Sequence, residues 1–118
     1  MVINKYSIGQ YKDDRGIILW ASQTLLQFDY KYLTIGTMKS GSSRGGHYHK
    51  KIKEKLMCIT GKIRFNLDGD ELYLNPGDIV DIPIGCIHTV YNDDCMEASF
   101  IEFKSQEFDQ KKDDTYTK

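Results

Sequence analysis

The sequence predicts an all-β domain, built from short strands as a barrel or a sandwich. Turn-forming residues recur at short intervals along most of the chain, and segments rich in β-branched and aromatic residues lie between them. Short strands spaced in this way are typical of all-β sandwiches and barrels. No segment before residue 100 has a convincing helical period, so we expect strands to organise the domain.

The expected strands follow one another between these turns. In chain order they are 17–20, 32–38, 56–59, 62–67, 71–74, 79–82, 88–91 and 98–103. Within 62–67 every second residue is apolar, as a strand with one buried face requires. The Asp68-Gly69 pair that follows readily adopts the positive φ angles of a tight turn, so a hairpin is expected there.

The remaining boundaries rest on Gly, Pro, Asn and Asp clusters, which favour turns through their backbone conformations. These clusters are 14–16, 40–46, 60–61, 75–77, 83–85 and 92–94. Residues 1–16 precede the first expected strand as a polar N-terminal arm. Residues 105–118 form a polar and charged tail, either loose or draped over the barrel.

Bulk composition limits the classes of protein that fit. A length of 118 residues suits one domain, taken as 1–118, and a net charge of -1 favours neither nucleic acid nor an anionic membrane as a partner. No apolar run reaches the roughly 20 residues that cross a bilayer. Three cysteines without paired spacing fit a reduced compartment, so a cytoplasmic location is expected.

Two blocks of residues at fixed spacing stand out from this background. The first contains Gly41, His47, His49, Glu54 and Gly61. The second contains Gly77, Pro83, Gly85, His88 and Asn92. All three histidines of the chain therefore fall within the two blocks, which would be unusual for scattered polar residues.

The spacing allows four of these side chains to converge. Successive strand residues alternate between faces, so His47 and His49 point the same way. Glu54 can return to that face from the start of the next strand, and a tight turn at 83–85 can bring His88 beside it. Three imidazoles and a carboxylate suit one divalent metal ion such as Zn, Ni, Mn or Fe. We therefore predict a metal site on these four residues.

The two blocks resemble the paired signature motifs of the cupin family. The resemblance implies a cupin double-stranded β-barrel, also called a jelly roll, with the metal held inside it. It further implies that His47, His49, Glu54 and His88 are the metal ligands. Small cupins commonly pair by exchanging or augmenting edge strands, so a homodimer is expected.

Further segments narrow the resemblance within the family. The run RGGHYHK at 44–50 and the ending FD-x4-DTY at 108–116 resemble the C-terminal cupin domain of capsular-polysaccharide reductase–epimerases. The same run and the early DxRG segment at 13–16 are similar to dTDP-4-keto-6-deoxyglucose ketoisomerases. The ketoisomerases usually lack Glu at the acidic position of the first block, so Glu54 favours the capsular group.

The resemblance implies a nucleotide-diphosphate sugar with a 4-keto group, epimerised or isomerised at C3 for surface-polysaccharide synthesis. A metal-bound histidine cannot also act as the base, so Tyr91, Tyr48 and Lys50 are the candidate catalytic groups. Without metal, His47 and His49 become the natural acid and base. Arg44, Lys50 and Lys51 are candidates for binding the diphosphate through charge-assisted hydrogen bonds.

Two other functions fit the same residues. Three histidines and a glutamate also hold iron in mononuclear dioxygenases, where the ion supports oxygen chemistry. A non-enzymatic sugar-binding cupin would keep the pocket without turnover. The residues alone do not choose among these functions, because one fold hosts many chemistries.

Overall fold

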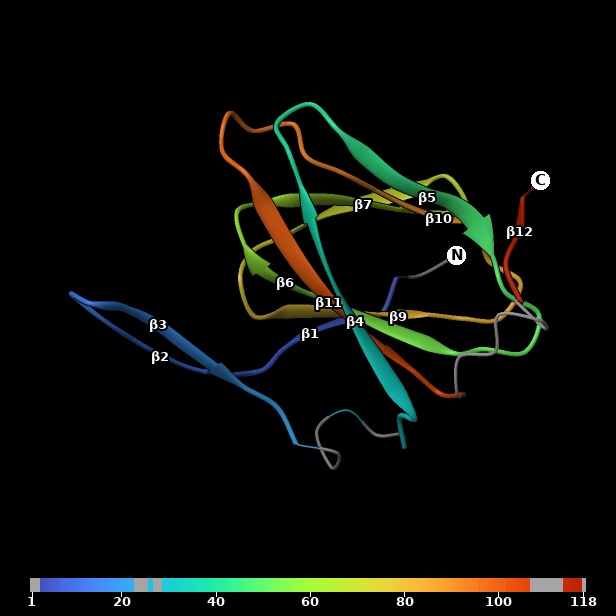
Figure 1. Ribbon diagram of the computed structural model, residues 1–118, viewed down its shortest axis with the longest axis horizontal. Coiled ribbons are helices and arrows are strands. Elements are labelled where there is room, and N and C mark those ends of the chain that lie inside the picture. The colour runs from blue at the N-terminus through green and yellow to red at the C-terminus, as the bar shows by residue number, and fades with distance from the viewer. Residues whose placement is uncertain (1–2, 23–25, 27–28, 107–113, 118) are drawn as a thin grey trace.

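The computed structural model describes residues 3–22, 26, 29–106 and 114–117, which form two facing antiparallel sheets and a separate hairpin (Figure 1). One five-stranded sheet contains, in spatial order, β1 (Lys5–Ser7), β9 (Asp78–Ile82), β6 (Glu54–Thr60), β11 (Ala98–Lys104) and β4 (Tyr32–Met38). The other contains β12 (Tyr116–Thr117), β5 (Ser43–Tyr48), β10 (His88–Tyr91), β7 (Ile63–Leu67) and β8 (Asp70–Leu74).

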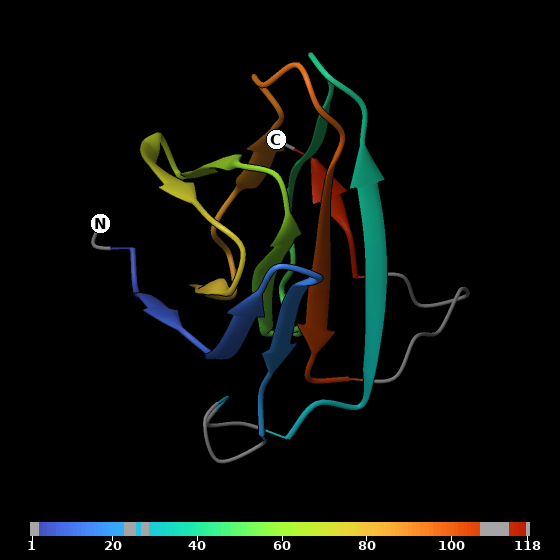
Figure 2. The same cartoon turned by 90° about the vertical axis from the view of Figure 1, so that its left-hand side faces the viewer.

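The hairpin joins β2 (Gly9–Asp13) to β3 (Gly16–Trp20) and extends away from the two sheets (Figure 1). Figure 2, turned by 90°, shows β4 as a long strand at the outer edge of its sheet. This arrangement confirms the predicted all-β jelly-roll class. The part of the chain that the structure describes contains no helix long and apolar enough to cross a membrane.

The expected strands all appear, most of them with ends shifted by one or two residues. The structure adds β1, β2, β5 and β12 to them. The short strands β1 and β12 are held by pairing with β9 and β5, which sequence periodicity does not reveal. The predicted tail therefore lies against the barrel at 114–117, whereas the Phe108-Asp109 pair of the resemblance lies outside the described residues.

The main core fills the space between the two sheets. Phe65 and Ile63 on β7, Val80 on β9 and Phe100 on β11 are buried together there. Alternation on β7 matches the prediction, because Ile63, Phe65 and Leu67 are buried while the residues between them are half-buried. The buried polar residues Glu54 and His88 lie next to this core, since they pair with its members Ile82 and Leu67.

Candidate metal centre

The histidine-bearing strands meet because two glycines precede His47. Gly45 and Gly46 both have positive φ angles, and a Cβ atom on Gly45 would lie 2.6 Å from the carbonyl oxygen of His88. A glycine therefore lets β5 approach β10 closely, at the point where the pairing register shifts between His88 and Thr89. In this register His47 lies directly opposite His88.

The other two predicted ligands come from the same end of the barrel. Glu54 begins β6, between Ile82 on β9 and Lys104 on β11. His49 follows the end of β5, and its carbonyl oxygen accepts a hydrogen bond of 2.7 Å from the backbone N–H of Gly85. The predicted 83–85 turn thus packs against the first motif block. Both ligand side chains are almost fully buried, with His49 at 3% and Glu54 at 2% exposure.

The structure brings all four predicted ligands together. The ring centroids of His47 and His88 lie 4.5 Å apart, and those of His47 and His49 lie 5.1 Å apart. One ligand atom from each of the three imidazoles lies within 4.8 Å of the others. Nε2 of His49 and Oε1 of Glu54 lie in direct contact.

The donor atoms fit a metal ion. Nε2 of His49, both carboxylate oxygens of Glu54 and Nδ1 of His88 are buried, and among the described residues none of these atoms has a well-formed hydrogen bond. Buried polar atoms are almost always satisfied, so such a cluster needs an explanation. A divalent ion accepts lone pairs from imidazole and carboxylate alike, and would satisfy these atoms together.

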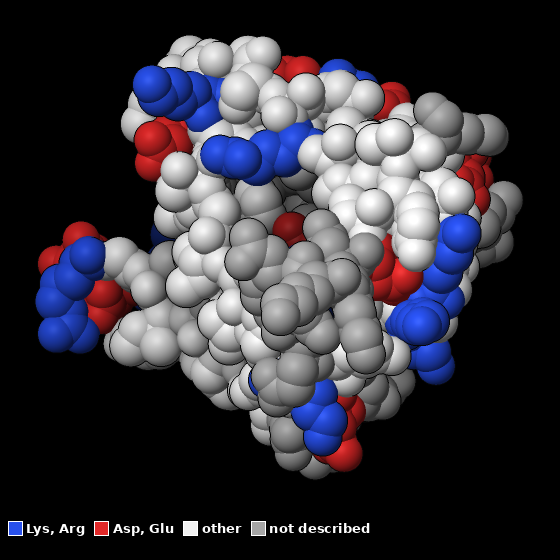
Figure 3. Space-filling view, turned by 45° about the vertical axis from the view of Figure 1, so that its right-hand side comes forward, with Lys and Arg blue, Asp and Glu red and all other residues white. Residues whose placement is uncertain are grey.

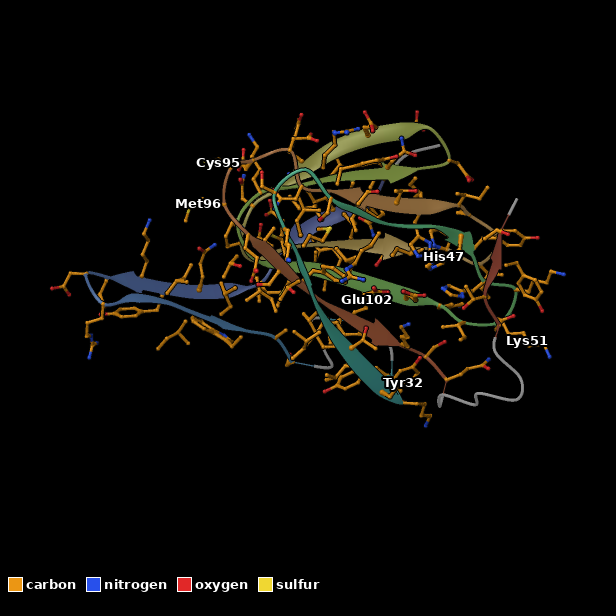
Figure 4. The ribbon with its side chains drawn as sticks, turned by 45° about the horizontal axis from the view of Figure 1, so that its top comes forward. Tyr32, His47, Lys51, Cys95, Met96 and Glu102 are labelled. Carbon is orange, nitrogen blue, oxygen red and sulfur yellow. The ribbon has the colours of Figure 1, made fainter. Side chains whose placement is uncertain are left out.

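Glu102 is a member of this site that the sequence motifs did not identify. It lies on β11, and one of its oxygens lies within 4.8 Å of ligand atoms on Glu54 and His88. Figure 4 shows Glu102 and His47 projecting from opposite sheets toward the barrel interior. The alternation of residues along the strand could have identified it, because Glu102 lies on the same face of β11 as the buried residues Ala98 and Phe100.

Burial and charge set the protonation of the cluster. Burial raises the pKa of Glu102 to about 9, with a further contribution from Glu54. Burial also acts to raise the pKa of Glu54, but His49, Glu102 and Lys104 outweigh it and hold that pKa below its usual range. Burial lowers the pKa of His88 to about 4. The interior therefore contains an ionised Glu54, a protonated Glu102 and a neutral His88 at neutral pH.

A cavity of about 470 Å³ opens beside the cluster, within the range of small-molecule sites. Figure 3 shows acidic atoms deep between other side chains on one face of the molecule, beneath a basic side chain. Residues of both sheets line the cavity. They are Thr34, Ile35, Gly36, Thr37, Arg44, Gly45, His47, Leu56, His88, Val90, Phe100 and Glu102. The cavity thus offers three proton-bearing groups and one exposed guanidinium.

The predicted substrate-binding residue Arg44 lies in the cavity wall. Its Nε donates a hydrogen bond of 3.0 Å to the carbonyl oxygen of Thr37. Lys50 and Lys51 are not among the residues that line this cavity. Nζ of Lys50 lies 4.1 Å from the centroid of the Tyr116 ring, and Figure 4 shows Lys51 at the outer end of the molecule.

The predicted catalytic tyrosines also lie outside the cavity wall. Tyr48 stacks on Tyr116 with ring centroids 5.6 Å apart, on the face of β5 opposite His47. The Tyr91 ring lies 4.0 Å from the Arg64 guanidinium, on the outer face of β10. The structure therefore does not bring Tyr48, Tyr91 or Lys50 together with the imidazoles.

Gly36 shapes the cavity by allowing the Phe100 ring to lie on β4. A Cβ atom at Gly36 would lie 2.5 Å from the Phe100 ring. We therefore expect Gly36→Ala to lower the free energy of unfolding by about 1–3 kcal/mol through overpacking. Urea denaturation measures the loss, and Gly36→Ala combined with Phe100→Leu should recover part of it. An unchanged midpoint in the single variant would contradict the close packing.

Comparison with known proteins assigns the chain to a family. The model of the family described as "Cupin domain" matches residues 34–103, which include all four predicted ligands. A UDP-2-acetamido-2,6-beta-L-arabino-hexul-4-ose reductase of Pseudomonas aeruginosa is 29% identical over 94% of this chain and 31% of its own length. A quercetin 2,3-dioxygenase of Bacillus subtilis is 37% identical over 36% of this chain and 13% of its own length. The chain thus spans less than a third of these curated relatives.

Solved structures share the fold more completely. A sugar 3,4-ketoisomerase from Thermoanaerobacterium thermosaccharolyticum in complex with TDP superposes with a TM-score of 0.81 at 19% identity, covering 98% of this chain and 88% of that one. The capsular polysaccharide assembling protein CapF from Staphylococcus aureus superposes with a TM-score of 0.66 at 30% identity, covering 76% of this chain and 27% of that one.

Proposed function

The chain belongs to the cupin domain family, and from that premise we propose that it is a metal-dependent epimerase or isomerase. Its substrate in this proposal is a nucleoside-diphosphate sugar with a 4-keto group, used in surface-polysaccharide synthesis. The observation that carries the proposal is a cavity lined by His47, His88 and Glu102, beside a group of imidazole and carboxylate side chains that could hold a metal ion. The similarity of 94% of the chain to a reductase named for a UDP-linked hexul-4-ose sugar supports the proposal.

The chemistry requires a stabilised enolate and a group that moves a proton. His47, His49, Glu54 and His88 would hold the ion, for which Zn, Ni, Mn and Fe are all suitable. When bound, such an ion supplies a Lewis acid that favours negative charge on a carbonyl oxygen. The protein residues then have to orient the sugar, exclude water and transfer the proton at C3.

Glu102 is the residue that we assign to proton transfer at C3. Histidines that hold the ion have no lone pair left for this task, which leaves Glu102 as the remaining acid–base side chain in the cavity wall. Glu102 is protonated in the metal-free cluster, so it would serve as the base where a bound divalent ion beside it lowers its pKa. Its carboxylate would then take the C3 proton while the electron pair of the C–H bond passes into the enolate. For isomerisation its acid form would return the proton to C4 on the same face of the enolate. Epimerisation would instead require a second proton donor, such as water, on the opposite face of C3.

The test of the proposed function is exchange of the C3 proton. Purified protein is incubated in deuterated buffer with a 4-keto-6-deoxy nucleotide sugar, and incorporation of deuterium at C3 is followed by NMR. Exchange and the appearance of an epimer or a 3-keto isomer are expected. The prediction fails if no C3 deuterium appears with TDP- or UDP-linked substrates in the metal-loaded protein.

Arg44 is expected to bind the diphosphate rather than to take part in proton transfer. Charge-assisted hydrogen bonds contribute about 1.5–3 kcal/mol, so Arg44→Ala should raise KM about 10- to 100-fold with a smaller change in kcat. Steady-state kinetics provide the measurement. Lys50→Ala is the matched control and should leave KM within about twofold, because Lys50 lies over Tyr116 instead of the cavity. Equal effects of the two variants would contradict the assignment.

A second candidate function is a mononuclear iron dioxygenase. The observation that favours it is the 37% identity with quercetin 2,3-dioxygenase, although that similarity covers 36% of this chain. Oxygen consumption by the Fe(II)-loaded protein with a flavonol would support it. Ligand binding without either exchange or oxygen uptake would instead indicate a non-enzymatic sugar-binding cupin.

A homodimer fits the apolar surface of the hairpin and the edge strand. Ile18 and Trp20 on β3 are 62% and 55% exposed, and Ile35 on the edge strand β4 is 67% exposed. Ile18 and Trp20 lie on the same face of β3, and exposed apolar patches commonly mark protein interfaces. Sedimentation equilibrium should therefore give twice the chain mass, and a monomer at micromolar concentration would contradict the proposal.

A further inference from the structure

The C-terminal segment is built into the wall that holds the predicted ligands. Strand β12 pairs with β5 in an antiparallel register that sets Tyr116 opposite Tyr48 and Thr117 opposite His47. Asp114, two residues before β12, is buried at 7% exposure although it belongs to the polar tail. The segment 114–117 thus adds a strand edge directly beside one histidine and a buried acidic residue beside another.

The Asp114 side chain holds the turn that links two predicted ligands. Its Oδ2 accepts hydrogen bonds from three successive backbone N–H groups, those of Lys50, Lys51 and Ile52, at 3.1, 2.6 and 3.0 Å. Consecutive amides converging on one oxygen form a concave anion site in the backbone. These three residues lie between His49 and Glu54, so the carboxylate of Asp114 fixes the path from one predicted ligand to the other.

The Asp114 backbone contacts the His49 ring itself. The carbonyl oxygen of Asp114 lies 2.8 Å from Nδ1 of His49, within a buried environment. A carbonyl oxygen can accept a hydrogen bond but cannot donate one, so Nδ1 must carry the proton. In the neutral ring Nε2 then keeps its lone pair, and Nε2 is the atom that faces Glu54 in the cluster.

From these contacts we infer that residues 114–117 form a strap that fixes His49 as its Nδ1–H tautomer and presents Nε2 to a ligand. Asp114 is a positioning residue, since it acts through His49 and is not among the residues that line the cavity. The consequence for metal binding rests on the proposed metal centre. Partners that orient a ligating histidine commonly change metal affinity by about 10- to 100-fold when they are lost.

The tautomer is measured directly by NMR on metal-free protein, at a pH above which the histidine ring signals no longer change with pH. Long-range ¹H–¹⁵N spectra of the ring nitrogens are simple to assign, because the chain has 3 histidines. Wild-type protein should show protonated Nδ1 and bare Nε2 at His49. Asp114→Ala should convert this signal to a mixture of tautomers. An Nε2–H tautomer in the wild type would overturn the inference, even if Asp114→Ala does not fold.

Two further variants separate positioning from general stability. Asp114→Asn keeps an oxygen that accepts amide hydrogen bonds, so it should retain the wild-type tautomer. Asp78→Ala is the matched control, because Oδ2 of Asp78 accepts a hydrogen bond of 2.9 Å from the backbone N–H of Asn75, at the opposite end of β9 from Ile82. Asp78→Ala should lower stability without changing the His49 signals. If the His49 tautomer changed in Asp78→Ala as well as in Asp114→Ala, the cause would be a general loss of stability, and the inference of a strap would be overturned.

Zinc binding, titrated against a chromophoric chelator, tests the consequence. Asp114→Ala should weaken zinc binding by 10-fold or more, while Asp114→Asn and Asp78→Ala stay within about threefold of the wild type. Unchanged affinity in Asp114→Ala, together with a changed tautomer, would overturn the link between strap and metal. If the wild type binds none of zinc, nickel, manganese and iron, the proposed metal centre fails, while the NMR result still decides the strap.

Discussion

Replacing Glu102 with glutamine is expected to lower the rate of C3 proton exchange by about 100- to 10,000-fold, the usual contribution of a positioned acid–base group. Glutamine keeps the size and polarity of the side chain but can neither take up nor release the proton. Glu102 lies on the cavity wall beside His88 and Glu54, so its loss removes the assigned acid–base group next to the substrate space. Deuterium incorporation at C3 provides the measurement.

Metal content must be measured on the same Glu102→Gln sample. It should stay near the wild-type value, because the predicted ligands are all retained. Glu71→Gln is the matched control, since Glu71 lies on β8 in an ion pair with Arg64 and outside the cavity wall. Loss of metal together with loss of exchange would make Glu102 a metal ligand, and unchanged exchange would remove it from the proton-transfer step.

The fold class and the set of four predicted ligands could be predicted from the motif spacing together with the family resemblance. Alternation sets His47 and His49 on one face, and the resemblance to the cupin motifs indicated that the turn at 83–85 brings His88 back beside them. Arg44 is also near the cavity because it precedes His47 on the same strand. These residues lie close to the glycines and prolines that determine the local path of the chain.

The remaining parts of the site depend on long-range packing. Glu102 enters through the pairing of β11 with β6, which sets Lys104 opposite Glu54 and is not encoded in any local motif. Asp114 reaches His49 across 65 residues of sequence. Tyr48 and Tyr91 were reasonable catalytic candidates by their position in the motifs, but strand alternation places both on faces opposite the imidazoles.

This difference explains why motif residues and catalytic residues need not coincide. A motif records residues that are close in sequence, and those are ligands and turn formers in this chain. A proton-transfer group can come from any strand that borders the cavity. Strand β11 belongs to the sheet that faces β5 and β10, the strands of His47 and His88 (Figure 4). The Glu54–Glu102 contact therefore joins a residue found by motif to one found by packing.

Zinc is expected to stabilise the wild-type protein strongly and the Glu54→Gln variant weakly. Binding to the folded state alone adds about 4 kcal/mol to the free energy of unfolding at a free metal concentration 1,000 times Kd. Glu54 is 2% exposed and contacts His49, so glutamine in its place fits the space but supplies no charge to the ion. A hundredfold loss of affinity would reduce the stabilisation at the same zinc concentration to about 1.4 kcal/mol.

Urea denaturation with and without zinc measures this difference, and each variant serves as its own reference. Any effect of Glu54→Gln on the metal-free protein therefore cancels. Glu71→Gln should show the full wild-type stabilisation, because its ion pair with Arg64 lies on the outer face of the barrel. Equal stabilisation in Glu54→Gln would exclude Glu54 as a ligand. No stabilisation by zinc, nickel, manganese or iron in the wild type would exclude the metal centre, and His47 and His49 would then be the acid and base of a metal-free isomerase.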